Sequence, residues 1–363
     1  MVNPTPAAEL DVTADLVRRL LAAQHPDLAG LPVEPLANGW DNTLFRLGGG
    51  LVARLPRRTL GARTLVNEQR WLPSLAPRLP LPVPVPVRTG VPGEGYPWPW
   101  SVVEFLPGTP ASDGPPFDPR RAAADLGGFF GALHVTAPPD APANPYRGVP
   151  LAQRADNFAR NLSAIAGQVD RGAVLAAWEA ALAVPGWDAA PVWLHGDPHP
   201  ANILIRDGRV SGMLDFGDIT AGDPASDLSL VWMLLPASCR GLFRAAYAKA
   251  GNGSISDATW ARGRGWALNL ACVFLAWSAD NPRLHAVGRR TLAAVLAALS
   301  GAGLAVAGLD AGVGAVEPPC VADVGDFESR RREHRFEEPA ERAVLGGSST
   351  TAGGRGKPNT CPA

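Results

Sequence analysis

Residues 193–205, WLHGDPHPANILI, place several polar side chains in a short loop between two apolar runs. The prolines at positions 198 and 200 stiffen this loop, because a pyrrolidine ring fixes the backbone φ angle. Polar groups held between buried flanks are rarely present for packing alone. The pattern therefore predicts that the loop holds Asp197 and Asn202 in fixed positions for a chemical purpose.

A second polar segment, 212-GMLDFGDITAGDPASDL-228, follows shortly after the first. The apolar runs 203–205 and 210–214 lie on either side of a predicted turn and indicate the two strands of a hairpin. The second strand carries Asp215 to its end. We therefore expect this carboxylate to lie at the same mouth of the hairpin as the two side chains of the loop.

Asp197, Asn202 and Asp215 together offer two carboxylates and one amide oxygen. Hard oxygen ligands suit Mg²⁺, which keeps several waters and binds through one or two carboxylates and substrate phosphates. Phosphoryl transfer uses this arrangement: one Asp orients or deprotonates the acceptor hydroxyl, while an Asn and a second Asp hold metal on the nucleotide. The three residues therefore indicate phosphoryl-transfer chemistry.

The pattern H-G-D-x-x-x-x-N followed by L-D-F-G resembles the aminoglycoside phosphotransferase family, whose fold is similar to that of protein kinases. The resemblance implies that Asp197 is the catalytic base and that Asn202 and Asp215 are Mg²⁺ ligands. It also implies that Asp227 supports the catalytic loop from the next helix, and that ATP or GTP is the phosphoryl donor. His195 is interpreted as bracing the loop through hydrogen bonds.

Two other interpretations of the loop remain open. HGD is also a common turn sequence, since His, Gly and Asp are frequent in turns. His195, Asp197 and His199 would alternatively suggest a zinc site, although no cysteine or third histidine lies nearby.

The N-terminal part of the chain is predicted to bind the nucleotide. Residues 33–56 read as three strands joined by two turns, and Asn42 lies in the first turn, where backbone N–H groups can cover phosphates. Kinase-like lobes pair a cation on the third strand with a helix Glu; here the candidates are Arg54 and Glu68, because no lysine lies nearby. The alternative is a surface Arg and a surface Glu that never meet.

The segment 102-VVEFLPG-108 resembles the hinge between the lobes of the same family. The resemblance implies that the backbone near Glu104 and Leu106 binds the adenine. An ordinary edge strand that ends at Pro-Gly is the alternative interpretation. The preceding proline-rich stretch, 79–87, is extended and cannot be a central strand.

The fold class expected from these elements is α+β, with a two-lobed, protein-kinase-like architecture: a small β-rich N-terminal lobe and a larger, mostly helical C-terminal lobe. We expect the N-terminal nucleotide-binding lobe, hinge included, to span residues 1–107. The C-terminal catalytic and acceptor-binding lobe is expected to span residues 108–312. Residues 313–363 are low in apolar content and are predicted to be disordered.

Composition restricts the partners. The 363 residues carry a net charge of −1 and no recurring basic block, so nucleic acid is not expected. The longest apolar run, 266–277, is too short to span a bilayer, and the N-terminus lacks a signal-peptide pattern, so no membrane association is expected. The four cysteines form no CxxC pair and read as reduced thiols of a cytoplasmic protein.

The acceptor is expected to be a small molecule with a hydroxyl group. Asp280, after the long helix near residues 257–279, is a candidate for the acceptor pocket, and an ordinary helix C-terminal turn is the alternative. A nucleotide-binding pseudokinase with a regulatory role is the alternative function, supported by the missing lysine. A protein kinase is disfavoured because no A-P-E segment follows Asp215. Acceptor identity, ATP versus GTP and oligomeric state stay open.

Overall fold

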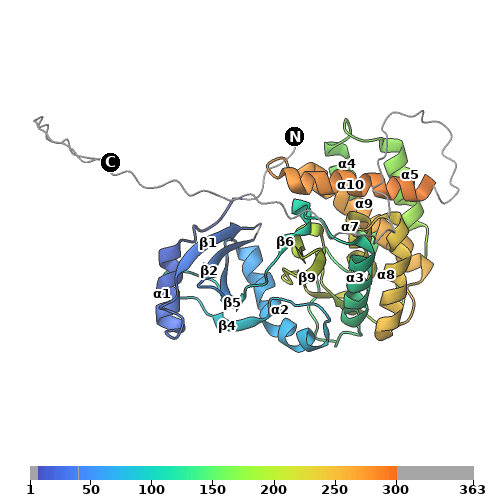
Figure 1. Cartoon of the computed structure of the whole chain (residues 1–363). Coiled ribbons are helices and arrows are strands. Elements are labelled where there is room, and N and C mark those ends of the chain that lie inside the picture. Colours follow the sequence, from blue (N-terminus) through green and yellow to red (C-terminus); the bar gives the residue numbers. More distant parts are fainter. Residues whose placement is uncertain (1–6, 40, 301–363) are drawn as a thin grey trace, which may run out of the picture. The chain divides into compact units, whose positions relative to one another are not determined.

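The computed structural model describes residues 7–39 and 41–300 of the chain (Figure 1). The segment 313–363, which the sequence predicts to be disordered, lies outside these residues. The described part contains a five-stranded antiparallel sheet near the N-terminus, followed by a mainly helical region with two small sheets.

The N-terminal sheet has the strand order β1-β2-β3-β5-β4. Its strands are β1 (Val33–Asn38), β2 (Asn42–Leu47), β3 (Leu51–Pro56), β4 (Pro86–Gly90) and β5 (Trp100–Glu104). The three strands predicted within 33–56 are confirmed. The proline-rich stretch 79–87 leads into β4, which is an edge strand, as a segment that lacks backbone donors must be.

Two helices accompany this sheet: α1 (Ala14–Gln24) and α2 (Thr59–Leu75). Thr13 caps α1, because its hydroxyl accepts a hydrogen bond from the Leu16 N–H at 3.3 Å. Successive side chains of β3 point to opposite faces of the sheet. Ala53 and Leu55 therefore join the apolar core shared with α1, while Arg54 between them faces Glu68 of α2.

The larger region consists of helices around one extensive apolar core. Its longer helices are α3 (Pro119–Leu133), α4 (Ala155–Ala164), α5 (Arg171–Leu182), α8 (Arg240–Tyr247), α9 (Asp257–Trp277) and α10 (Pro282–Ser300). Its strands are β6 (Thr109–Pro110), β7 (Val192–Leu194), β8 (Ile203–Arg206), β9 (Arg209–Met213) and β10 (Thr220–Gly222). The hairpin predicted around the 207–208 turn is the β8–β9 pair. Leu72 and Leu75 of α2 join this core, which attaches α2 to both regions.

Several shorter elements complete the helical region. Residues 225–234 form two short helices, α6 (Ala225–Leu228) and α7 (Leu230–Leu234). A 3₁₀ turn, Leu151–Arg154, directly follows Pro150 and leads into α4. The antiparallel pair β7–β10 was not predicted, because three-residue strands are too short to show a period of two.

Candidate active site

The loop after β7 is braced by the imidazole of His195. Its Nε2 donates to the Leu214 carbonyl at 2.9 Å, and its Nδ1 accepts from the Asp197 N–H at 3.2 Å. The ring is fully buried, so this single neutral tautomer satisfies both nitrogens. Because both nitrogens are used inside the loop, His195 has none left for zinc.

Asp227 of α6 fixes the start of the same loop by accepting hydrogen bonds from its backbone. Its fully buried carboxylate accepts the His195 N–H at 2.7 Å and the Gly196 N–H at 3.0 Å. Gly196 itself has φ +89°, and a Cβ there would collide with the carbonyl oxygen of Asp218. Glycine is therefore required at the position where the protein-kinase pattern has arginine.

Two residues that the sequence did not single out, His134 and Tyr247, extend the hydrogen-bond network of Asp227. The Nε2 atom of His134 lies 3.1 Å from an Asp227 carboxylate oxygen, and its Nδ1 lies 3.0 Å from the Tyr247 hydroxyl. A carboxylate only accepts, so the His134 Nε2–H donates to it and the Nδ1 accepts from Tyr247. His134 follows an amphipathic helix and reads as an ordinary core histidine, so only its three-dimensional partners reveal this role.

Asn202 and Asp215 lie at the mouth of the β8–β9 hairpin. The Asn202 amide NH₂ donates to the Asp197 carbonyl at 3.0 Å, and the Leu214 N–H donates to the Asn202 carbonyl at 2.8 Å. These bonds tie the loop to the end of β9, immediately before Asp215. Asp215 has φ +61°, a left-handed conformation that is uncommon for a residue with a side chain. Its side chain is 52% exposed, so its carboxylate is open to a ligand.

The donor set of this mouth suits a divalent cation with oxygen ligands. The NH₂ group of Asn202 is used by the loop, which leaves its Oδ1 as the atom available to a metal. The exposed carboxylate of Asp215 supplies a second oxygen. Among residues 7–39 and 41–300 no group of three or more His, Cys, Asp and Glu side chains is arranged around a metal-sized space. An ion held here would therefore need ligands from a substrate or from water.

Arg54 connects the N-terminal sheet to this mouth. Its guanidinium donates to both Glu68 carboxylate oxygens, at 2.6 and 2.8 Å, and to an Asp215 oxygen at 3.1 Å. Burial lowers the pKa of Arg54, but Glu68 and Asp215 raise it by more, so the guanidinium stays charged. Arg54 and Glu68 thus meet as a buried pair, which excludes the alternative of two separate surface residues.

Asp41 lies in the connection between β1 and β2, and Asn42, which the sequence placed in that turn, is the first residue of β2. The Oδ1 atom of Asn42 is buried and has no hydrogen-bond partner within the described residues. Asp41 pairs with Arg58 at 3.2 Å. Burial raises the pKa of Asp41 to about 6; Arg58 opposes this rise, and the charges of Asp215, Asp218 and Asp197 add to it. The negative charges of Asp215, Asp218 and Asp197 therefore contribute to the raised pKa of Asp41.

The predicted hinge residues lie at the end of β5. Glu104 pairs with Leu51 of β3 in the sheet, and Leu106 follows in the connection towards β6. The Phe105 N–H between them already donates to the Gly50 carbonyl at 2.8 Å. Binding of a base by the backbone at Glu104 and Leu106 stays a prediction.

Asp197 forms an ion pair with Arg147 and lies near His199. The Arg147 guanidinium donates to one of its carboxylate oxygens at 2.7 Å, and the His199 Nε2 lies 3.4 Å from the other. Burial raises the pKa of Asp197, but Arg147 and then His199 lower it by more, and the net pKa lies below its usual range. The carboxylate is therefore ionised at neutral pH. Arg147 was not predicted, because it stands in a Pro- and Gly-rich stretch without a periodic pattern.

Other predicted or neighbouring residues lie around this centre. The carboxylate of Asp218 accepts from the Asn144 amide at 2.8 Å. Asp280, the candidate for the acceptor pocket, is exposed in the turn between α9 and α10. Its role in the acceptor pocket stays a prediction.

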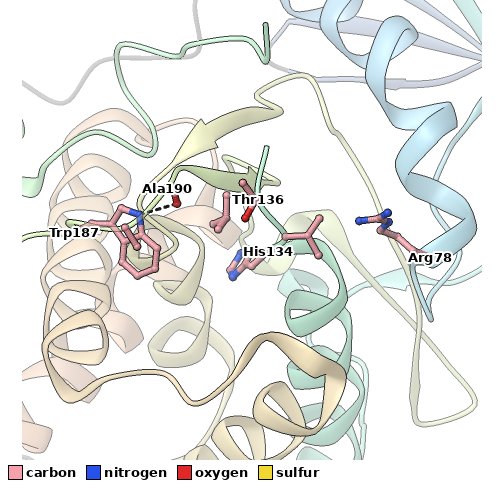
Figure 2. A pocket seen from close by; sticks show the side chains of 8 residues that line it. Arg78, His134, Thr136, Trp187 and Ala190 are labelled. Carbon is pink, nitrogen blue, oxygen red and sulfur yellow. Dashed lines mark hydrogen bonds between the residues drawn. The ribbon is translucent and has the colours of Figure 1, made fainter. Parts of the chain in front are cut away.

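A cavity of about 550 Å³ has none of the predicted site residues in its lining, although its lining residue His134 contacts Asp227. Figure 2 shows His134, Thr136 and Trp187 around it, with Arg78 on its opposite side and the Trp187 indole donating to the Ala190 carbonyl. The catalytic mouth is thus defined by its polar groups and not by the volume of a cavity.

Comparison with known proteins decides the family. The model of the phosphotransferase enzyme family (APH) matches residues 32–266, which include both polar segments and Arg54. The chain belongs to this phosphotransferase enzyme family. It is therefore a phosphotransferase, and the alternative of a pseudokinase is not favoured. A search of curated protein sequences gave no match.

Solved structures show the same fold. The GDP complex of aminoglycoside 2′-phosphotransferase-IIIa superposes with a TM-score of 0.57 at 20% identity, covering 79% of this chain and 99% of that one. An APH(2″) enzyme solved with GDP and kanamycin gives 0.56 at 20% identity, covering 78% and 98%. The macrolide 2′-phosphotransferase MphH from Brachybacterium faecium gives 0.52 at 23% identity, covering 77% and 97%. The predicted α+β, two-lobed, kinase-like fold is confirmed.

The described part of the phosphotransferase contains no helix that is both long and apolar enough to cross a bilayer. Its described cysteines, Cys239 and Cys272, are buried and form no disulfide within the described part. A cytoplasmic location stays a prediction.

Proposed function

We propose that this phosphotransferase transfers the γ-phosphoryl group of ATP or GTP, with Mg²⁺, to a hydroxyl group of a small molecule. The observation that carries the proposal is the chain of contacts Glu68–Arg54–Asp215, which is buried at Glu68 and Arg54 and open at Asp215, beside the loop of Asp197 and Asn202. It links the expected nucleotide-binding sheet to the expected catalytic loop through charged groups. Well-packed apolar residues would stabilise this contact between the two regions about as well as the charged groups do. The charges therefore suggest a role in function.

The proposed roles follow from the environment of each side chain. Asp197, ionised and held by Arg147, accepts the hydrogen bond of the acceptor hydroxyl and receives its proton. The hydroxyl oxygen forms the new bond to phosphorus, while the bond from the γ-phosphorus to the bridging oxygen breaks and the nucleoside diphosphate leaves. Arg54 provides a fixed positive charge towards the phosphates from β3.

Asn202 and Asp215 are the residues proposed to hold Mg²⁺, which when bound neutralises developing charge on the phosphate oxygens. Asn202 directly precedes β8 and Asp215 follows β9 at the same end of the hairpin, and Arg54 contacts the Asp215 carboxylate, which supports this assignment. Asn42 is proposed to face the nucleotide, because its buried Oδ1 has no hydrogen-bond partner among the described residues. Glu104 and Leu106 are proposed to bind the base.

The acceptor class follows from the family and its structural neighbours, whose names give aminoglycosides and macrolides as the compounds they phosphorylate. We therefore propose a hydroxyl-bearing small molecule of this general size. Apart from the two catalytic segments, no acid-rich run is present that would select a polycation. Neutral sugars and amino alcohols therefore belong among the candidates.

The test uses the purified full chain with labelled ATP or GTP and Mg²⁺, against kanamycin, macrolides, sugars and amino alcohols. Transfer of label to at least one compound by the wild type is expected. Asp197→Asn should lower that rate by about 10²- to 10⁴-fold, the usual contribution of a general base. Asp207→Asn, in the exposed β8–β9 turn, serves as the matched control and should keep the wild-type rate.

Label release to water by the same proteins provides a second measurement that needs no acceptor. Equal turnover of nucleotide by the wild type and Asp197→Asn, in transfer and in hydrolysis, would refute the proposed role of the loop.

A further inference from the structure

The contact between Arg147 and Asp197 links the catalytic loop to a distant part of the chain. Arg147 lies 50 residues before Asp197, in the connection between α3 and α4. The side chain of Arg147 is 18% exposed and that of Asp197 is 27% exposed, so most of this ion pair is shielded from water. Shielding strengthens the interaction relative to an exposed pair.

The backbone that carries Arg147 is fastened beside the loop. The Thr220 hydroxyl and the Ala221 N–H both donate to the Pro142 carbonyl, and the Asp223 N–H donates to the Gly148 carbonyl at 2.9 Å. Gly148 has φ +67°, and a Cβ there would lie 2.6 Å from Leu194 Cδ1. The segment is therefore held against β10 and the end of β7, and it presents Arg147 from a fixed position.

The hydrogen bonds of Arg147 differ from those of a structural arginine in this protein. Arg262, also buried, bonds through its Nε and both of its terminal nitrogens to Asp223, Thr259 and the Pro185 carbonyl. Asp197 is the only hydrogen-bond partner of Arg147 within the described residues, and its buried Nε has none. Arg57, Arg154 and Arg264 also have a buried Nε without a hydrogen-bond partner in the described part, so the unpaired Nε by itself does not mark a site. The feature that distinguishes Arg147 is that its hydrogen bond goes to the carboxylate of Asp197.

We propose that Arg147 is a positioning residue for the phosphoryl-transfer reaction: it holds one oxygen of Asp197, while the other oxygen, 3.4 Å from the His199 Nε2, keeps a lone pair for the acceptor hydroxyl. This proposal rests on the role given to Asp197 above. Arg147 carries a fixed charge, and its pKa is raised: burial lowers it, but Asp197 and Asp218 raise it by more. It therefore keeps the carboxylate in one orientation regardless of whether an acceptor is bound.

The test compares Arg147→Ala, Arg147→Gln and Arg147→Lys by release of phosphate from Mg-ATP to water. Arg147→Ala should lower kcat by about 10- to 100-fold, since a misplaced catalytic group costs on this order. The KM for ATP should stay within about twofold, because Arg147 touches no residue proposed to bind nucleotide. Arg147→Gln should be as slow as Arg147→Ala, and Arg147→Lys should be intermediate, because the charge remains but the planar guanidinium is lost.

Two further measurements separate positioning from a structural role. Added guanidinium ion should restore part of the kcat of Arg147→Ala, because it can take the place of the missing side-chain group. It would not restore kcat if the substitution had damaged the fold. In the Asp197→Asn background the Arg147→Ala change should alter kcat by less than about twofold, because the two residues act as a unit. Arg70→Ala is the matched control: it removes an exposed 2.6 Å pair with Asp140 of the same connection and should leave kcat unchanged.

The outcomes also distinguish this inference from the proposed function. Wild-type kcat in Arg147→Gln, with Asp197→Asn inactive, overturns the role of Arg147 and leaves the proposed function intact. Full activity of Asp197→Asn overturns both. Should Arg147→Ala fail to fold, Arg147→Lys and Arg147→Gln decide, because both keep more of the side-chain volume than alanine does. Wild-type rates in both of these variants refute the proposal.

Discussion

At the scale of single residues, Arg54 stands where the kinase-like pattern leads us to expect a lysine, and its guanidinium makes contacts on two sides. The planar guanidinium bonds both oxygens of Glu68 and still reaches Asp215. A lysine ammonium is a compact point charge and cannot reproduce this flat, three-way arrangement. The arginine thus joins the helix and the catalytic mouth through one group.

Arg54→Lys is therefore expected to keep the fold and to lose catalytic efficiency. One charge-assisted hydrogen bond contributes about 1.5–3 kcal/mol, so kcat/KM for Mg-ATP should fall by about tenfold or more. Steady-state kinetics on the purified variant measure this. Arg88→Lys, whose arginine pairs with exposed Asp27, is the control and should match the wild type. An Arg54→Lys variant as efficient as the wild type would show that the Asp215 contact is dispensable.

The raised pKa of Asp41 predicts that the free energy of unfolding of the nucleotide-free protein depends on pH. The pKa of Asp41 is raised from 3.8 to about 6, by burial first and also by Asp215, Asp218 and Asp197, against the opposing effect of Arg58. An acid with a raised folded-state pKa destabilises the fold when ionised. This penalty is full above about pH 6 and disappears as the pH falls towards the unfolded value.

Asp41→Asn should therefore gain stability relative to the wild type as the pH rises. The difference in free energy of unfolding between variant and wild type should be about 1 kcal/mol larger at pH 8 than at pH 5. Urea unfolding at both pH values measures it. Asp15→Asn, at an 80% exposed side chain, is the control. A difference that does not change with pH would contradict the raised pKa of Asp41.

At the scale of elements, α6 positions the catalytic loop through Asp227. The helix is only four residues long, yet it places one buried carboxylate under two consecutive backbone N–H groups of the loop. His134 of the segment after α3 contacts the same carboxylate. Loop, helix and segment thus share a single acceptor.

Asp227→Asn should lower both stability and activity. An amide offers one acceptor oxygen, so at least one buried N–H loses its partner, at a cost of about 1–3 kcal/mol. The expected result is a fall of this size in the free energy of unfolding and a kcat reduced by about tenfold or more, as the loop shifts. Asp257→Asn, at a 93% exposed partner of Arg244, is the matched control. An unchanged kcat in Asp227→Asn would show that catalysis does not depend on the hydrogen bonds from Asp227 to the loop.

At the scale of the whole molecule, α2 and Arg54 connect the N-terminal sheet to the helical region, so binding of the proposed nucleotide at the sheet should stabilise both. Nucleotide with Mg²⁺ at about 100 times its Kd should raise the free energy of unfolding by about 2.7 kcal/mol. Thermal unfolding with Mg²⁺ and a non-hydrolysable ATP analogue measures it, and removal of Mg²⁺ with EDTA should abolish most of the gain.

Asp215→Asn is expected to lose the Mg²⁺-dependent part of that stabilisation. The control is Asp257→Asn, which should respond to Mg-nucleotide like the wild type. Equal stabilisation with and without Mg²⁺ in the wild type would argue against a metal at Asn202 and Asp215.

The catalytic loop and hairpin are predictable from the sequence because their geometry is local. Asp197 and Asn202 lie five residues apart on a proline-stiffened loop, and the following hairpin returns the chain to Asp215 within a few more. Covalent connection and turn chemistry fix this arrangement with little help from distant contacts. The strands of the N-terminal sheet and the long helices were predictable for the same reason, since their periodicity is continuous.

Only the tertiary structure decided which distant side chains complete the site. Arg54 and Asp215 are 161 residues apart, His134 and Asp227 93, and Arg147 and Asp197 50. Such pairs leave no local signal: an arginine in a Pro- and Gly-rich connection reads as a solvated charge until the chain folds back. Close packing of the two regions removes water from these charges and forces them to find partners, which a linear sequence does not display.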